Sequence, residues 1–168
     1  VGFTKIPRAA SPEQLVDLLG GIFSDFDALT DQLNLEKIKT IGDSYMIAGG
    51  VPEASERHCD RMATMAILMQ KHINQIPRFN GTEIQLRVGI HSGPVIAGVI
   101  GTRKFAYDLW GDTVNIASRM ESHGLPGRIQ VSEVVYEKLR DNFRFEERGI
   151  INVKGRGTMT TYWLISAL

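Results

Sequence analysis

One carboxylate, Asp43, occupies a position where a chain reversal would expose it. Residues 36–41 are predicted to form a strand, Gly42 and Asp43 a tight turn, and residues 45–48 the returning strand of a hairpin. A carboxylate on a rigid hairpin tip can bind a hard cation such as Mg²⁺. Aspartate is also common in turns for conformational reasons alone, so the residues themselves leave both interpretations open.

A polar pair, Asn115 and Arg119, lies in a segment predicted to be helical over residues 112–121, with Asp112 or Thr113 as its N-cap. Residues four positions apart share a helix face. An arginine projecting from such a face can bind a phosphate through two parallel hydrogen bonds. The alternative is an ordinary solvated polar face above an apolar one.

Two further sets of charged residues have a structural and a functional interpretation. Lys39 and Asp108 are a donor and an acceptor on separate predicted strands, and on their own they indicate only a surface salt bridge. Lys154 and Arg156 alternate with glycines in the segment KGRG, which suits a flexible phosphate clamp. A basic hairpin turn explains the same segment equally well.

Two amphipathic helices are expected to support these side chains. The first begins with Ser11 as N-cap, Pro12 at the first helical position and Gln14 completing a capping box, and it ends near Leu33. The second is predicted over residues 55–76, and we interpret its methionine-rich face as part of the core.

Short strands account for most of the remaining chain, and a helix from Ser132 to Leu139 interrupts them. Because the strands form hairpins, the predicted class is α+β with a mostly antiparallel sheet flanked by helices. The element order is that of a ferredoxin-like βαββαβ core with a C-terminal β/α extension and a first strand truncated at the N-terminus. The predicted strands are 86–90, 95–99, 105–110, 129–131, and 143–147 paired with 160–165.

Composition bounds the classes of protein that remain. The 168 residues predict one domain over 1–168. The 19 basic and 19 acidic residues give a formal charge of zero, which argues against a dedicated nucleic-acid binder. The single cysteine, Cys59, excludes a disulfide framework and a multi-cysteine zinc site. No apolar run could span a bilayer and there is no signal peptide, so we expect a cytoplasmic domain. The sequence starts at Val1 rather than at a methionine, so we expect a piece of a longer protein.

Several common catalytic and nucleotide-binding motifs are missing from the sequence. It has no P-loop, no GxGxxG, no HExxH and no GxSxG motif. The four histidines lack metal-ligand spacing. Ser92 beside His91 does not predict nucleophilic catalysis, because adjacent residues rarely point at each other.

Taken together, the segments resemble the catalytic domains of class III nucleotidyl cyclases, of the adenylyl cyclase type. The resemblance is carried by residues 36–46 (EKIKTIGDSYM) and 105–120 (FAYDLWGDTVNIASRM), with shorter similarities at 1–4 (VGFT) and 151–157 (INVKGRG). These segments follow one another in the family's order, and the similarity covers essentially the whole chain.

The resemblance implies a role for each candidate residue. It implies two divalent ions, Mg²⁺ or Mn²⁺, in each site, and it places the family's other metal aspartate two positions before Val1. Pro94 stands where some members have an arginine that contacts phosphate. The implied roles are metal binding by Asp43, adenine recognition by Lys39 and Asp108, catalysis by Asn115 and Arg119, and phosphate binding by Phe3, Thr4, Lys154 and Arg156.

The resemblance also implies an activity and an assembly. The activity is conversion of ATP to 3′,5′-cyclic AMP and pyrophosphate at sites shared between the two chains of a homodimer, with regulatory domains attached in the parent protein. The alternatives are a guanylyl cyclase, or a catalytically silent nucleotide-binding or dimerisation module, because the first metal aspartate is absent from this sequence.

Overall fold

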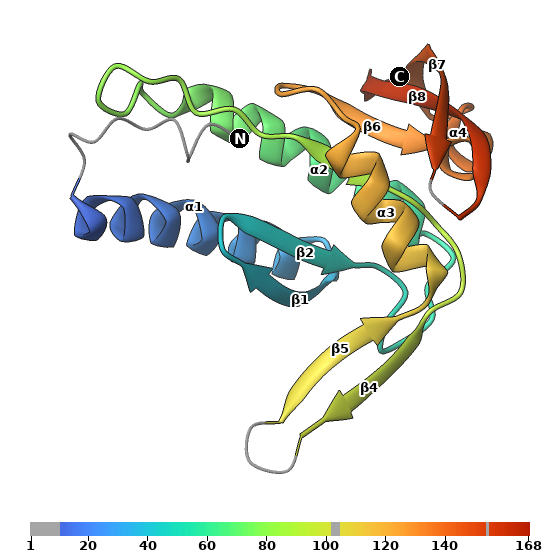
Figure 1. Cartoon of the computed structure of the whole chain (residues 1–168), viewed down its shortest axis with the longest axis horizontal. Coiled ribbons are helices and arrows are strands. Elements are labelled where there is room, and N and C mark those ends of the chain that lie inside the picture. Colours follow the sequence, from blue (N-terminus) through green and yellow to red (C-terminus); the bar gives the residue numbers. More distant parts are fainter. Residues whose placement is uncertain (1–10, 102–104, 154) are drawn as a thin grey trace.

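The structure, a computed structural model, describes residues 11–101, 105–153 and 155–168. The chain alternates helices with strands and closes with a long hairpin (Figure 1). The elements are α1 (Pro12–Gln32), β1 (Glu36–Ile41), β2 (Ser44–Ala48), α2 (His58–Gln75), β3 (Val88–Ile90), β4 (Ile96–Ile100), β5 (Ala106–Trp110), α3 (Asp112–Ser122), β6 (Ile129–Ser132), α4 (Glu133–Leu139), β7 (Phe143–Val153) and β8 (Gly157–Ala167).

Within the described residues, the strands form one four-stranded sheet and two separate hairpins. The sheet has the order β3-β6-β8-β7, in which β3 and β6 are parallel and the other neighbours are antiparallel. The hairpins are β1–β2 and β4–β5, both antiparallel. The predicted α+β class with a mostly antiparallel sheet is therefore confirmed, whereas the truncated first strand falls on residues outside the described ranges.

The two long helices enclose a core beneath the β1–β2 hairpin. The start of α1 is as expected: the Ser11 side chain accepts a hydrogen bond from the Gln14 backbone, and the Gln14 side chain accepts one from the Ser11 backbone. A second cluster joins α2, α4 and the sheet around Ala63, Val131 and Leu139. The first cluster contains Ile22, Phe26, Leu35, Met65, Met69, Ile73 and Ile84, which confirms the methionine-rich face of the second helix as core.

Three predicted helix starts differ in detail from the structure. The second helix begins at His58 rather than near residue 55. The N-cap of α3 is Gly111, with φ 137°, so neither candidate side chain caps this helix. Ser132 does precede α4, but its side chain makes no cap bond, because the hydroxyl lies 2.7 Å from Nδ1 of His91.

Helix α3 lies unusually close to the edge strand β3. A Cβ atom on Gly89 would lie 2.0 Å from the backbone nitrogen of Glu121, so only glycine permits this approach. The buried face of α3 carries Ile116 and Met120, which pack against Val153 of β7. Because α3 carries two candidate site residues, this contact helps to position them.

The β4–β5 hairpin projects away from the rest of the chain as an arm (Figure 1). It leaves large apolar side chains in solvent. Isolated two-stranded hairpins are marginally stable in water, so such an arm suits packing against another surface. The large apolar residues that the arm exposes are Ile96, Val99, Ile100 and Phe105.

None of the helices in the described ranges combines the length and apolar character needed to cross a bilayer.

Candidate active site

The metal candidate Asp43 is exposed in the two-residue turn between β1 and β2. Within the described ranges, no group of three or more His, Cys, Asp or Glu side chains could hold a metal ion. Mg²⁺ is commonly held by one or two carboxylates together with the phosphates of its substrate. An exposed carboxylate on a rigid turn fits that mode of binding, in which the nucleotide supplies further oxygen ligands.

Lys39 of β1 and Asp108 of β5 meet across the gap between the two hairpins. The Lys39 ammonium lies 2.5 Å from Oδ2 of Asp108, and the Leu109 backbone N–H donates to Oδ1 at 2.8 Å. The hydrogen bond from Lys39, followed by the one from Leu109, lowers the pKa of Asp108. The carboxylate is therefore ionised at neutral pH, and the pair presents one cationic donor beside one anionic acceptor.

This pair lines an open pocket of about 570 Å³. Ile38, Pro52 and Phe105 supply apolar lining, and Glu36 and Lys37 add a further carboxylate and a further basic residue. Binding sites for small molecules typically combine such apolar walls with a few polar groups that fix orientation. The pocket therefore suits a flat, partly polar ring whose edge carries both an acceptor and a donor.

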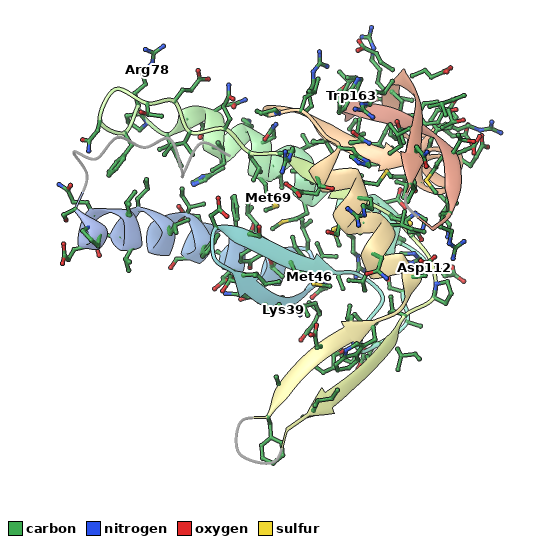
Figure 2. All side chains as sticks on the ribbon, in the orientation of Figure 1. Lys39, Met46, Met69, Arg78, Asp112 and Trp163 are labelled. Atoms are coloured by element: carbon green, nitrogen blue, oxygen red, sulfur yellow. The ribbon has the colours of Figure 1, made fainter. Side chains whose placement is uncertain are left out.

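A β-bulge lies next to this pair in β1. Lys37 is opposite Ile47 and Lys39 is opposite Met46, so Ile38 is an extra residue without a cross-strand partner. Figure 2 shows Lys39 on the side of the hairpin that faces β5.

Asn115 and Arg119 lie one turn apart on the exposed face of α3, as expected. Ile116 and Met120 on the opposite face are buried, at 3% and 0% exposure. Both candidate side chains therefore project from a helix that the core holds in place.

The phosphate candidate Arg156 makes an ion pair with Asp112, at the first turn of α3. Asp112, Asn115 and Arg119 are spaced i, i+3 and i+7, so they lie along one face of the helix. The ion pair thus brings the β7–β8 turn to the end of the face that carries Asn115. The other phosphate candidates, Phe3, Thr4 and Lys154, lie outside the described residues.

One chain brings some of the candidates together and separates others. Lys39 and Asp108 are in contact, and Asn115, Arg119 and Arg156 are grouped by α3. The turn that carries Asp43 lies at the end of its hairpin away from α3 (Figure 1). One chain therefore does not gather Asp43 with Asn115 and Arg119.

Sequence reasoning overlooked two acidic partners, Asp112 and Asp27. It treated Asp112 as a helix cap, although the spacing to Asn115 and Arg119 already placed it on their face. Asp27 of α1 accepts hydrogen bonds from Lys37 and Tyr45 of the β1–β2 hairpin. No local pattern signals that partnership, because it joins a helix to a hairpin later in the chain.

Comparisons with known proteins identify the family of this chain. The family model described as the adenylate and guanylate cyclase catalytic domain matches residues 1–166. An adenylate cyclase of Mycobacterium tuberculosis is 50% identical over 98% of the chain, and the rat guanylate cyclase soluble subunit beta-2 is 47% identical over 100%. The chain spans 37% and 25% of these two relatives.

Among solved structures, the guanylate cyclase domain of RhGC from Catenaria anguillulae, in complex with GTP, superposes with a TM-score of 0.95 at 34% identity. The likeness covers 100% of this chain and 92% of that one. Family model, relatives and structural neighbour thus agree across nearly the full sequence. The chain belongs to the class III adenylyl and guanylyl cyclase catalytic domains.

Proposed function

We propose that residues 1–168 form one adenylyl cyclase catalytic domain, which converts ATP to 3′,5′-cyclic AMP and pyrophosphate. The observation that carries the choice of ATP is the pair of Lys39 and Asp108 in the pocket between the hairpins. The family makes cyclic nucleotides from either purine, so the base must be chosen by the polar groups that meet its edge.

The two side chains complement adenine better than guanine. Adenine presents an acceptor at N1 beside a donor amine at C6, which match a lysine donor and an ionised aspartate. Guanine presents a donor at N1 and an acceptor at O6. Its edge would match a protein acceptor opposite N1 and a protein donor opposite O6, which is the reverse of the match to adenine. A site built on such polar pairs can discriminate strongly, because the wrong base leaves buried groups unpaired.

The remaining residues suit the chemistry of cyclisation. The 3′-hydroxyl attacks the α-phosphorus and pyrophosphate leaves, so negative charge grows on the phosphoryl oxygens. A fixed guanidinium such as that of Arg119 stabilises this charge more in the transition state than in the ground state. Asn115, one turn earlier, orients the ribose, and Lys154 and Arg156 bind the terminal phosphates.

Asp43 would hold the divalent ions together with the triphosphate and with the aspartate that the family places before Val1. Bound Mg²⁺ or Mn²⁺ ions would lower the pKa of the attacking hydroxyl and neutralise the triphosphate. The chain's own contribution is a carboxylate fixed on a short turn between two paired strands.

We propose further that the active unit is a homodimer with two equivalent sites. The turn between β1 and β2, which carries Asp43, lies away from α3, which carries Asn115 and Arg119 (Figure 1), so two chains can complete each site by contributing one set apiece. The exposed apolar side chains of the β4–β5 arm, such as Ile100 and Phe105, suit packing against a second copy. A symmetric dimer uses the same surface on both subunits.

The test of the activity is cyclic-nucleotide production from ATP and from GTP, with Mg²⁺ and with Mn²⁺, by a chain extended upstream of Val1. We expect cyclic AMP as the main product. A folded double variant, Lys39→Glu with Asp108→Cys, should lose ATP use. An unaltered preference for ATP in that variant would refute the assignment of these two residues, and cyclic GMP as the main wild-type product would favour the guanylyl cyclase alternative.

The test of the shared site is complementation. An Asp43→Ala chain and an Arg119→Ala chain should each be inactive alone and should recover activity when mixed, because each heterodimer contains one intact site. Dimer formation by both variants is the required control. No recovery from confirmed heterodimers would contradict shared sites, and absence of any product from the extended wild-type chain would favour the catalytically silent alternative.

A further inference from the structure

The β1 strand carries two lysines, Lys37 and Lys39, that lie on opposite faces of the hairpin. In a regular strand, residues two positions apart share a face. The bulge at Ile38 breaks this alternation, since bulges redirect the side chains beside them. Lys37 consequently lies on the face of Ile47, and Lys39 lies on the face of Met46.

Lys37 is held on its face by a polar cluster from α1. Its ammonium lies 2.7 Å from the Asp27 carboxylate and 5.1 Å from the centroid of the Tyr45 ring. The Tyr45 hydroxyl also donates to Asp27, and Oγ1 of Thr30 lies 3.4 Å from that hydroxyl. Burial alone would raise the pKa of Asp27, but the hydrogen bonds from Lys37 and Tyr45 outweigh it and lower the pKa.

Aromatic packing fixes the position of this cluster. The Tyr45 ring lies 5.4 Å from Phe23 and 5.6 Å from Phe26, both on α1. The residue before the bulge is therefore tied to α1 through Asp27. The residue after the bulge is tied to β5 through Asp108. Ile38, the bulged residue, thus lies between two lysines whose ion pairs hold them on opposite faces of the hairpin.

The competing arrangement of this strand has no bulge. With the turn and the pair Lys39–Met46 kept, Ile38 would move opposite Ile47, onto the apolar face that packs on α1. Lys37, which already lines the pocket, would then move to the face of Lys39, and its ammonium would leave Asp27 and lie beside Asp108. An isoleucine favours burial over exposure, so the bulged arrangement depends on the charged contacts that hold Lys37 on the α1 face.

We propose that Asp27 and Tyr45 are positioning residues for base recognition. By holding Lys37 against α1, they maintain the bulge, keep Ile38 in the wall of the pocket and leave Lys39 as the one lysine of β1 that faces Asp108. This inference rests on the proposed function, in which Lys39 and Asp108 read the base. It assigns part of the base selectivity to a cluster on α1 that holds the ammonium of Lys37, a residue of the pocket lining, away from Asp108.

The main experiment is the substitution Asp27→Asn, which keeps the size of the side chain and removes its charge. The KM for ATP should rise roughly three- to tenfold with kcat nearly unchanged. A change of this factor is typical when a hydrogen bond to a partly exposed charged group is weakened. Tyr45→Phe removes one of the two donors to Asp27 and should shift KM in the same direction by a smaller factor.

The matched control is Asp25→Asn on the same helix. Asp25 lies 3.0 Å from His72 of α2 and makes no described contact with the hairpin. The same chemical change there should leave the KM for ATP as it is in the wild type. Equal shifts in KM for Asp25→Asn and Asp27→Asn would overturn the proposal.

A second background tests whether Asp27 acts through the pocket. In a Lys39→Ala chain, Asp27→Asn should have much less effect on KM, because the group that it helps to place is gone. An undiminished effect in that background would refute the positioning role. A KM for ATP that Lys39→Ala leaves unchanged would instead refute the base assignment in the proposed function.

The pairing register of β1 with β2 can be measured without an activity assay. Nuclear magnetic resonance contacts between strands should place Lys37 opposite Ile47 in the wild type and opposite Ala48 in Asp27→Asn. If the wild-type register persists in the variant, Asp27 does not maintain the bulge. This measurement reports on the anchoring whether or not ATP is the substrate.

Discussion

Gly89→Ala is the substitution whose effect follows most directly from the geometry. The added Cβ would lie 2.0 Å from the backbone nitrogen of Glu121 and 2.6 Å from the carbonyl carbon of Met120. Real Cβ atoms essentially never approach closer than 3.0 Å, so α3 and β3 must separate by about 1 Å. Backbone atoms cannot rotate away as a flexible side chain can, and the separation must therefore involve the whole C-terminal turn of the helix.

Overpacking of a core costs about 1–3 kcal/mol, and a clash with backbone belongs at the upper end of that range. About 3 kcal/mol corresponds to a melting temperature roughly 6–12 °C lower for a domain of this size. Turnover of the folded variant should also fall, since the displaced helix α3 carries Asn115 and Arg119. A displacement of about 1 Å in a catalytic arrangement can reduce the rate by roughly 100-fold.

The assay pairs thermal unfolding with steady-state ATP turnover, and the matched control is Gly20→Ala. Gly20 lies inside α1 with nothing within 4 Å of its Cβ position. Alanine there should stabilise the chain by about 0.5–1 kcal/mol, because glycine is the weaker helix former. A Gly89→Ala chain that melts within about 1 °C of the wild type and keeps its turnover would refute the close approach of α3 to β3.

Three further predictions test individual side chains. Arg119→Ala should lower kcat roughly 100- to 1000-fold with a much smaller change in KM, and a raised KM with intact kcat would show that it only binds the ground state. Asp112→Asn should change the free energy of unfolding in urea by less than about 1 kcal/mol, because Asp112 and Arg156 are both about half exposed; a larger loss would show a structural role. Burial lowers the pKa of His91 below its ordinary 6.5, so the unfolded chain binds the proton more readily and stability falls as the pH drops from 6.5 toward the folded pKa. His91→Asn should therefore reduce the difference between the unfolding free energies at about pH 7.5 and about pH 5.5. An unchanged difference would show that His91 is not the source of the pH dependence.

Features set by neighbouring residues were predictable from the sequence. The capping box at Ser11 and Gln14 and the turn at Gly42 depend on contacts within a few positions, and both lie where the patterns placed them. The pairing of Lys39 with Asp108 was predicted as a possible salt bridge, but only the fold shows that it lines a pocket.

Features set by distant residues were not predictable from local patterns. Ser132 has the residue type of a helix cap, yet its hydroxyl pairs with His91 of the loop that follows β3. Lys37 and Lys39 are spaced like two residues on one face of a regular strand, but in the structure Lys37 pairs with Asp27, Lys39 pairs with Asp108, and a bulge lies between them. Both partners are distant in the sequence, so the spacing of the lysines could not predict these contacts.

The bulge at Ile38 gives β1 one residue more than the paired segment of β2. A single-codon deletion of Ile38 would remove that extra residue and leave Lys37 and Lys39 adjacent in a regular strand. Adjacent residues point to opposite faces, so each lysine would keep its face and its partner, Asp27 or Asp108. Among descendants of this sequence, a one-residue gap at this position would therefore preserve both ion pairs and remove only an apolar side chain from the pocket wall.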